Sequence, residues 1–358
     1  MKVIFDHQIF SVQEHGGVSR LFAELYRNLL KIGVNCDIPL VFSNNEYLKE
    51  RKTKGFLKKI NFPGKLTLIK LINQYHMSKI LKERSYDIFH PTYFDDYFLK
   101  YIGDKPFVLT VFDLIHEKYY HDSPNLQKTL NTKRNLISKA SKIISISQKT
   151  KKDLVDYYHI DQNKIEVVYP ANSLNPSSTV KCKVPKEYIL FVGSRRQYKN
   201  FDIVLRSMRK IDNQVFLVCA GGGKITPDEI SKIKQLNLVD RVIQVNVNDR
   251  QLAYCYKNAI CFIYPSLYEG FGIPILEAFS CDCPVLLSDI DVFKEVAGKA
   301  AIYFNPKSED ALSASINLIF NNENSRNVLI KLEKNRLKLY SWSNMARETL
   351  SVYKSIYK

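Results

Sequence analysis

The sequence lacks the features that mark several common classes of protein. None of its apolar runs is long enough to span a lipid bilayer. Its glycine-rich turns do not complete a dinucleotide-binding fingerprint, and there is no P-loop with its phosphate-binding lysine. We also identify no clustered Asp-x-Asp of the metal-binding kind. These absences argue against a membrane-spanning protein and a nicotinamide-dependent oxidoreductase, and they predict that no metal or other cofactor is required.

The cysteines also fit no framework. There are seven, an odd number, and they are scattered, while Cys281 and Cys283 lack the two-residue spacer of a zinc knuckle or redox pair. We expect reduced, mostly buried thiols in a cytoplasmic protein. The start of the chain carries Asp6 and His7 inside an apolar stretch, so it is predicted to be a first strand and not a signal peptide.

Positive charge, in contrast, is abundant. The formal net charge is +17, a field that attracts nucleic acid, anionic lipid or phosphorylated ligands. We find no element typical of nucleic-acid readers, so no nucleic-acid partner is expected. Residues 49–84 hold eleven lysines and arginines against two glutamates, with Phe, Leu and Ile interleaved. Such a stretch suits an anionic membrane surface, and a solvated lysine-rich face explains it equally well.

Strand and helix patterns alternate along the chain. This alternation predicts an α/β protein with mainly parallel sheets, arranged as two Rossmann-like domains that face each other across a cleft. A polar linker at 171–185 separates a first domain, 1–172, from a second, 184–342. The last segment, 343–358, is predicted to be a helix that packs back on the first domain. Ligands of such sheets bind beyond the carboxyl ends of the strands.

Three loops at strand ends could carry chemistry. The first contains Gly16 and Gly17 before a helix, where backbone and helix dipole favour anions. The second follows the strand at 188–192 and places Arg195, Arg196 and Lys199 within seven residues, cations that could neutralise a diphosphate. Each of these loops, taken alone, could also be an ordinary turn.

The third loop, residues 264–278, is the most informative. Pro274 is expected to open a helix, with Glu277 in its first turn and Glu269 in the loop before it. The amides of Gly270, Phe271 and Gly272 could bind oxygen atoms at the helix N-terminus. Two carboxylates beside an anion site are reasonable acceptors for the hydroxyl groups of a ribose and a sugar.

Glu269, seven residues and then Glu277 in a loop-to-helix turn resembles the signature of the family-4 retaining glycosyltransferases, which have the GT-B fold. The segments His7–Phe10 and Gly16–Arg20 resemble the opening of a bacterial branch that builds surface polysaccharide. Residues 110–116, 144–147 and 193–200 also fall where that family places its motifs. The resemblance covers nearly the whole chain.

The resemblance implies specific roles. Arg195 and Lys199 would bind the donor diphosphate, Glu277 the ribose and Glu269 the sugar. The amides of Gly270 to Ile273, including Phe271 and Gly272, would hold sugar and phosphate, and Gly16 and Gly17 would close over the diphosphate. Asp113 matches a polar position in the cleft and joins Arg195, Lys199 and Glu269 as a catalytic candidate. His116 and Gln13 are candidates for contact with the acceptor or the sugar.

One departure from the family concerns the residue before Asp113. Many members have a histidine there, which contacts the donor sugar, whereas this chain has Phe112. His116 or Asp113 could take over its role, or the sugar could be held differently. The expected activity is transfer of a hexose, with retention and without metal, from GDP-mannose or, second, a UDP-sugar. The acceptor is expected to be lipid-linked or an oligosaccharide, in the synthesis of lipopolysaccharide or capsule. The reaction is expected in the cytoplasm, with the anionic inner membrane surface as a further partner. The alternative is an inactive sugar-nucleotide-binding or scaffold protein of the same fold.

Overall fold

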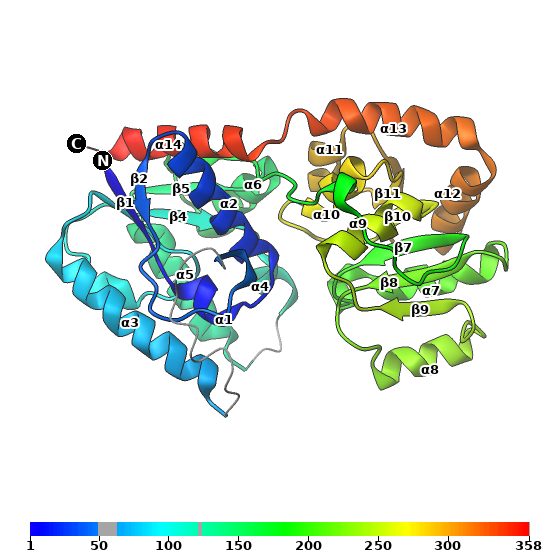
Figure 1. Cartoon of the computed structure of the whole chain (residues 1–358), viewed down its shortest axis with the longest axis horizontal. Helices are drawn as coiled ribbons and strands as arrows, with labels where there is room; N and C mark the ends of the chain where they lie inside the picture. The colour runs from blue at the N-terminus through cyan, green and yellow to red at the C-terminus, as the bar shows by residue number, and fades with distance from the viewer. Residues whose placement is uncertain (49–62, 121–123, 358) are drawn as a thin grey trace. The chain divides into compact units, whose positions relative to one another are not determined.

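The computed structural model describes residues 1–48, 63–120 and 124–357, and the chain divides into two α/β units (Figure 1). Unit 1 comprises Met1–Pro170 together with Ser341–Lys358, and unit 2 comprises Ala171–Tyr340. The first unit is therefore built from both ends of the chain. The segment 171–185, expected to be a linker between the domains, falls within unit 2.

The strands of unit 1 are all parallel to their neighbours. They form two three-stranded sheets in the orders β2-β1-β3 and β4-β5-β6, joined by one parallel bridge between Phe89 and Phe107. The strands are short and mostly buried, as expected for a sheet covered on both faces. Their bounds are β1 (Lys2–Phe5), β2 (Asn35–Asp37), β3 (Ile88–His90), β4 (Val108–Val111), β5 (Lys142–Ser145) and β6 (Ile165–Val167).

Helices of unit 1 connect these strands, and the last one comes from the far end of the sequence. Ser341 caps α14 by accepting a hydrogen bond from the amide of Asn344, and α14 packs against α2. The hydroxyl group of Tyr353 lies 2.7 Å from Nδ1 of buried His90, whose Nε2 lies 2.8 Å from the hydroxyl group of Thr110. Burial lowers the pKa of His90 to about 3, so this link is made by a neutral ring. The α-helices are α1 (Gln8–Val12), α2 (Gly17–Lys31), α3 (Lys65–Glu83), α4 (Ile115–Tyr119), α5 (Leu126–Lys139), α6 (Gln148–Tyr158) and α14 (Trp342–Ile356).

Unit 2 contains one six-stranded parallel sheet. Its order, β9-β8-β7-β10-β11-β12, is that of a dinucleotide-binding Rossmann domain. Strands β7, β8 and β9 follow one another toward one edge of the sheet, and β10, β11 and β12 follow one another toward the other edge. The strand order therefore reverses between β7 and β10, and the loops that leave these two strands flank the position where such sheets bind ligands. The strands are β7 (Tyr188–Val192), β8 (Phe216–Ala220), β9 (Val242–Val245), β10 (Cys261–Tyr264), β11 (Val285–Ser288) and β12 (Ile302–Phe304).

The helices of unit 2 begin at clear sequence signals. Thr226 and Glu229 form a reciprocal capping box at the start of α8, where Pro227 is the first helical residue. Asn248 and Gln251 do the same for α9. The helices cover a core built from the buried strands, and they are α7 (Phe201–Ser207), α8 (Pro227–Gln235), α9 (Asp249–Asn258), α10 (Ile273–Ser280), α11 (Asp291–Ala297), α12 (Glu309–Asn321) and α13 (Glu323–Leu337).

Several expectations can be compared with this fold directly. Strands β2 and β12, at edges of their sheets, were not predicted, and neither is buried along its whole length as the equally short β3 is. All seven cysteines are free thiols, and six of them are buried. In the part of the chain that the structure describes, no helix is both long and apolar enough to cross a membrane. Of the basic stretch 49–84, residues 49–62 lie outside the described residues.

Candidate active site

Two loops of unit 2 meet at the carboxyl edge of the sheet. The loop after β7 contains η6 (Gln197–Lys199), and the loop after β10 contains Glu269. The amide of Leu267 donates a 2.8 Å hydrogen bond to the carbonyl oxygen of Tyr198, which joins the two loops directly. The sequence predicted chemistry in both loops, and the sheet order explains why they become neighbours.

Lys199 and Glu269 form an ion pair across this junction. Lys199 Nζ lies 2.5 Å from Glu269 Oε1 and 3.3 Å from the hydroxyl oxygen of Tyr264. Both charged side chains are largely buried, with 14% and 12% of their surfaces exposed. Burial lowers the pKa of Lys199, but the nearby Glu269 carboxylate outweighs it, and the net pKa is raised. The lysine is therefore fully charged at neutral pH. A phosphate oxygen would have to compete with the Glu269 carboxylate to bind it.

Arg195 makes a different set of contacts from the one that the sequence suggested. Its Nε donates to Glu229 Oε1 at 2.9 Å, and its terminal nitrogens donate to the carbonyl oxygens of Gly221, Gly223 and Lys224 at 2.9–3.3 Å. Only 2% of the side chain is exposed. The guanidinium group thus fastens the glycine turn after β8 to the loop after β7. The Glu229 carboxylate also takes part in the capping box of α8, so it contacts both Arg195 and the start of that helix.

The glycine turn can approach Arg195 only because it lacks side chains. Gly222 has a φ of 72°, and a Cβ atom built on it would lie 2.2 Å from the carbonyl oxygen of Gly193. Both the left-handed backbone and the close contact require glycine here.

Glu277 lies in the second turn of α10 and is buried. The prediction that it lies in the first turn is wrong, because α10 begins at Ile273, one residue before Pro274, and Glu277 is its fifth residue. Its Oε2 accepts a 3.2 Å hydrogen bond from the hydroxyl group of Tyr256 on α9. Burial and the adjacent carboxylate raise the pKa of Tyr256, so the phenol keeps its proton and orients Glu277.

The turn into α10 has a tightly packed backbone. Its N-cap, Gly272, has a φ of 106° and has no side chain to cap the helix. A Cβ atom there would lie 3.0 Å from Ile275 and 3.2 Å from Phe293. Gly270 and Phe271 are buried beside it, and Ile273 and Pro274 are half-buried. The amides expected to contact a ligand therefore belong to a well-packed turn and not to a loose loop.

The expected residues of the first loop lie in unit 1. Gly16 is the N-cap of α2, and Gly17 is exposed with open space around it. Gln13 Oε1 accepts a 3.3 Å hydrogen bond from the amide of Ser19 in the first turn of α2. The Gln13 side chain thus satisfies one amide at the helix end where an anion was expected.

Asp113 and His116 follow β4 in the same unit. Asp113 Oδ1 accepts a 3.0 Å hydrogen bond from the amide of Ile115 at the start of α4, and the His116 ring packs on Tyr120. Phe112, at the position where the resemblance implied a histidine, is buried edge-on against Phe22 and Phe94. In this chain the position serves aromatic packing.

Sequence reasoning missed a buried ion pair behind this loop. Lys133 on α5 and Glu117 on α4 are fully buried, with Nζ 2.7 Å from Oε1. Lys133 Nζ also donates to the backbone carbonyl of Asp113 at 2.8 Å, and the Tyr158 hydroxyl group donates to the same Glu117 oxygen at 2.6 Å. One signal was available, since Lys133 lies three residues before Leu136 and four before Ile137, on the buried face of its helix.

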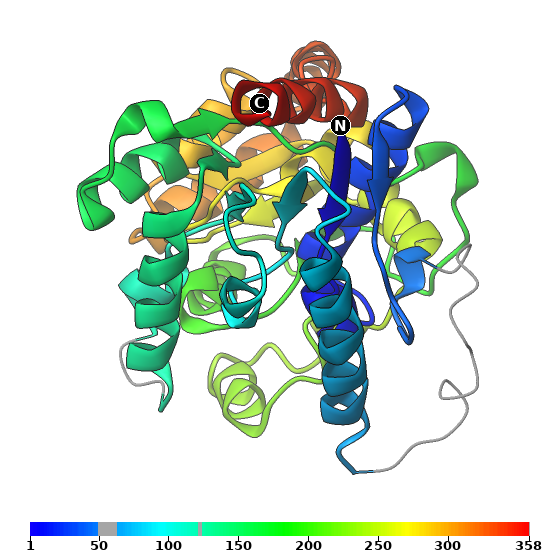
Figure 2. The same ribbon diagram turned by 90° about the vertical axis from the view of Figure 1, so that its left-hand side faces the viewer.

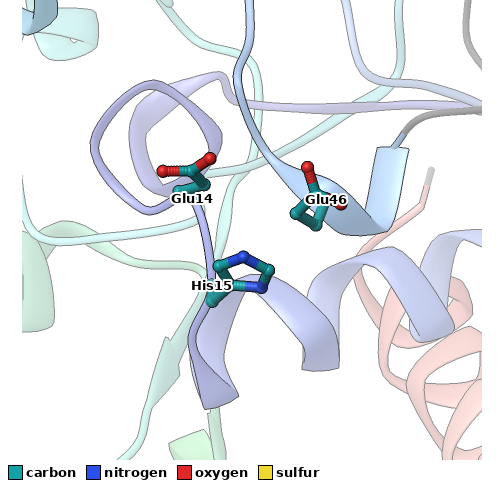
Figure 3. Close-up of side chains that lie close together, drawn as sticks. All are labelled: Glu14, His15 and Glu46. Atoms are coloured by element: carbon teal, nitrogen blue, oxygen red, sulfur yellow. The ribbon is translucent and has the colours of Figure 1, made fainter. Parts of the chain in front are cut away.

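One cluster of three possible metal ligands occurs among the described residues. Glu14, His15 and Glu46 come from the loop before α2 and from η1 (Glu46–Leu48), and their ligand atoms lie within 4.8 Å of one another (Figure 3). Glu14 and His15 are exposed, and such groups are common on surfaces. The sequence argument also overlooked the Asp-x-Asp spacing of Asp289 and Asp291. Here Asp289 forms an ion pair with Lys294, and Asp291 lies in the first turn of α11.

A cavity of about 840 Å³ lies elsewhere, in unit 1. Residues that line it, such as Pro106, Phe107 and Ser141, precede β4 and β5. It therefore opens at the amino ends of these strands. Because ligands of parallel α/β sheets bind at the carboxyl ends, we do not place the active site there.

Comparison with known proteins identifies the family. Residues 15–173 match the family model for Glycosyltransferase Family 4, and residues 179–336 match the model for Glycosyl transferases group 1. This chain belongs to the family-4 glycosyltransferases. In this family-4 glycosyltransferase the first match falls largely in unit 1 and the second lies in unit 2.

Two relatives of this glycosyltransferase are named as enzymes of O-antigen synthesis. The chain is 31% identical over 183 residues to the O-antigen chain mannosyltransferase RfbU of Salmonella typhimurium, covering 50% of this chain and 51% of that one. It is 26% identical over 251 residues to the O-antigen chain mannosyltransferase B of Escherichia coli, covering 66% of each. The chain thus covers less than two thirds of the length of either relative.

Solved structures show that the fold is GT-B. The sucrose-phosphate synthase of Thermosynechococcus elongatus matches with a TM-score of 0.78 at 18% identity, over 99% of both chains. The Anabaena protein HepE in complex with UDP matches with a TM-score of 0.72 at 16% identity, over 99% of this chain and 100% of that one.

Proposed function

We propose that this glycosyltransferase moves a hexose from a nucleoside-diphosphate sugar to a glycan acceptor, with retention of the anomeric configuration. The observation that carries the proposal is the junction at the carboxyl edge of the unit 2 sheet. Lys199 and Glu269 come from the two loops that flank the reversal of strand order, and buried Glu277 lies on the helix that follows. A cation for a diphosphate and carboxylates for sugar hydroxyl groups are thereby collected in one unit.

The donor is proposed to be GDP-mannose, with a UDP-sugar as the second candidate. The two relatives named as mannosyltransferases support the first, and the UDP bound to the structurally similar HepE supports the second. Glu277, oriented by Tyr256, would accept hydrogen bonds from the ribose, and Glu269 from the sugar.

Retention would follow from attack by the acceptor hydroxyl group on the face that the diphosphate leaves. A phosphate oxygen of the leaving group could take the proton, so no protein base is required. Lys199 would stabilise the growing negative charge in place of a metal ion. Arg195 would reach the diphosphate only by exchanging Glu229 for a phosphate oxygen; otherwise it acts by holding the glycine turn.

The acceptor is proposed to be a lipid-linked or free oligosaccharide in the synthesis of a surface polysaccharide such as lipopolysaccharide or capsule. The naming of both relatives as O-antigen enzymes supports this class. His116 and Gln13 of unit 1 are the candidates for contact with the acceptor or the sugar, and Asp113 is a catalytic candidate. We place the reaction in the cytoplasm, at the inner face of the membrane that carries lipid-linked acceptors.

A transfer assay tests this proposal. The purified chain is incubated with GDP-mannose or UDP-hexoses that carry a radiolabel in the sugar, and with lipid extracts that contain polyprenyl-linked glycans. We expect label in the lipid phase and a new linkage with the anomeric configuration that the sugar has in the donor. Glu269→Gln should lose both, and Glu323→Gln, at an exposed position, should keep both. Nucleotide binding without transfer or hydrolysis of any donor would favour an inactive sugar-nucleotide-binding protein.

A further inference from the structure

Three metal-ligating side chains of unit 1 come together from two separate segments of the chain. Glu14 and His15 lie in the loop before α2, and Glu46 is the first residue of η1. One ligand atom of each side chain lies within 4.8 Å of the other two (Figure 3). Figure 2 shows η1 at the outer edge of unit 1, and Glu14 and His15 are exposed. An ion can therefore reach this cluster from solvent.

Backbone hydrogen bonds hold the two segments together. The amide of Glu46 donates a 3.0 Å hydrogen bond to the carbonyl oxygen of Glu14. The Asn45 side chain donates to the carbonyl oxygen of Gln13 at 2.7 Å, and Asn45 is only 2% exposed. The cluster is thus built on a fixed junction. A metal ion would not have to order two distant segments, and it would avoid the conformational entropy cost of doing so.

The imidazole of the cluster is also supported from one side. The His15 ring packs edge-on against Tyr47, with 6.3 Å between the ring centres. Arg20 in turn fixes Tyr47, because its guanidinium lies 4.8 Å from the ring centre and donates a 3.0 Å hydrogen bond to the hydroxyl group. In Figure 3 a ring nitrogen of His15 faces the space between the two carboxylate groups. The ring is therefore restrained in a position from which it can bind a metal ion.

The two carboxylates of the cluster favour a cation between them. Like charges at this spacing repel each other, and Glu14 forms no ion pair within the part of the chain that the structure describes. Nitrogen and oxygen ligands of Zn²⁺ stand about 2.0–2.2 Å from the metal, and hence about 3–3.5 Å from one another. Side-chain rotations that move the ligand atoms of Glu14, His15 and Glu46 by about an ångström would therefore close the site.

We propose that Glu14, His15 and Glu46 bind a divalent transition metal of the zinc type, which fastens the loop before α2 to η1. One imidazole and two carboxylates are a set that zinc accepts, whereas Mg²⁺ and Ca²⁺ prefer oxygen ligands alone. Three protein ligands leave a fourth position to water. The site belongs to unit 1 and supplies no group to the junction of Lys199 and Glu269, so the proposed transfer does not depend on it.

Titration calorimetry of the whole chain with Zn²⁺, after removal of metal by EDTA and dialysis, tests the proposal. We expect one Zn²⁺ to bind per chain and to raise the melting temperature, because a ligand of the folded state stabilises it. A large excess of Mg²⁺ should not compete. His15→Asn and Glu46→Gln should each weaken the binding about a hundredfold, since the loss of a mere outer-shell partner already costs about 10- to 100-fold in metal affinity.

Matched variants elsewhere in the chain provide the controls. Asp156→Asn/His159→Asn removes an exposed carboxylate and an exposed imidazole at the end of α6, and asparagine tolerates the left-handed backbone of position 159. Cys182→Ser removes the one thiol that is not buried. Both variants should bind Zn²⁺ like the unaltered chain. Without metal, His15→Asn should also melt like the unaltered chain, because its side chain is exposed.

Three results would overturn the proposal. They are no binding of Zn²⁺ by the unaltered chain, equally strong binding by His15→Asn and the controls, and displacement of Zn²⁺ by Mg²⁺. The second result would mean an adventitious ion only, held by scattered surface groups.

Nucleotide binding separates this proposal from the proposed function. His15→Asn should keep an unaltered thermal shift with the donor nucleotide, because unit 2 holds the nucleotide-binding candidates. A chain that binds Zn²⁺ through this cluster but binds no nucleotide would leave the metal site standing and overturn the proposed donor site.

Discussion

Lys199 Nζ lies 2.5 Å from Glu269 Oε1, and this contact joins the loop after β7 to the loop after β10. Each partner is therefore occupied by the other when no donor is present. A bound diphosphate would offer Lys199 a phosphate oxygen in place of Glu269, and a bound sugar would offer Glu269 a hydroxyl group in place of Lys199. Because each residue must release the other to bind the donor, the two changes of partner are coupled.

This coupling predicts non-additive kinetics. Lys199→Met and Glu269→Gln should each lower kcat/KM for the donor by about two to three orders of magnitude. The double variant should lose little more than the worse single variant, because residues in contact do not act independently. Donor turnover measures this, with Lys234→Met on the exposed side of α8 as the control. Fully additive losses would show that the pair does not act as a unit.

Arg195 is predicted to support both folding and turnover. Arg195→Ala removes four hydrogen bonds and leaves Glu229 without its cation. We expect a loss of about 2–4 kcal/mol in the free energy of unfolding and a drop in turnover of several orders of magnitude. Thermal unfolding and kinetics at a temperature where the variant is folded measure the two effects. Arg209→Ala, at an exposed position of the same unit, should change neither by much. An Arg195→Ala chain with unaltered melting and turnover would disprove this role.

The sequence was sufficient to predict these cations but not their partners. The loop after β7 and the paired glutamates could be found because their spacing is local. The partner of Arg195 is Glu229, thirty-four residues away on α8, and no local pattern links the two. The helix register of Glu277 was also beyond local reasoning, because Pro274 could stand at the first or second helical position.

The buried pair of Lys133 and Glu117 predicts an asymmetric response to mutation. Lys133→Met should cost about 3–5 kcal/mol, because Glu117 is left buried without a cation. Lys133→Met/Glu117→Leu should recover most of that loss, since an apolar pair of similar size is tolerated. Urea unfolding measures both. If the double variant were no more stable than Lys133→Met, the pair would not be the cause of the destabilisation.

The same pair illustrates which part of unit 1 escaped prediction. Most of the strands followed from apolar runs, and the helix over 148–158 followed from its pattern. Lys133 has the residue type of a surface position and the spacing of a core position, and only the fold decides between them. Its hydrogen bond to the carbonyl oxygen of Asp113 shows why a lysine can be accommodated there.

Glu333 on α13 is predicted to make stability depend on pH. The carboxyl group is buried, and burial raises its pKa well above the ordinary value. At pH values between the ordinary pKa of the unfolded chain and the raised pKa of the folded chain, Glu333 keeps its proton in the folded chain and loses it on unfolding. The free energy of unfolding therefore falls as pH rises, by about 1.4 kcal/mol per pH unit.

Glu333→Gln should remove this dependence. Relative to the unaltered chain, the variant should gain more stability at pH 8 than at pH 5, as measured by urea unfolding at both values. Glu323→Gln, an exposed position on the same helix, should show the same small effect at both. A gain for Glu333→Gln that is equal at the two pH values would contradict the assigned pKa shift.

The most direct test of a nucleotide-sugar site in unit 2 is a thermal-shift measurement with UDP, GDP, ADP and CMP, each with and without EDTA. One nucleotide should raise the melting temperature, because a ligand at about a hundred times its Kd stabilises the folded chain by about 2.7 kcal/mol. The shift should persist in EDTA, disappear in Glu277→Ala and shrink in Tyr256→Phe, which removes the hydroxyl group that orients Glu277. A shift that is unchanged in Glu277→Ala, or the absence of any shift, would contradict the proposed site.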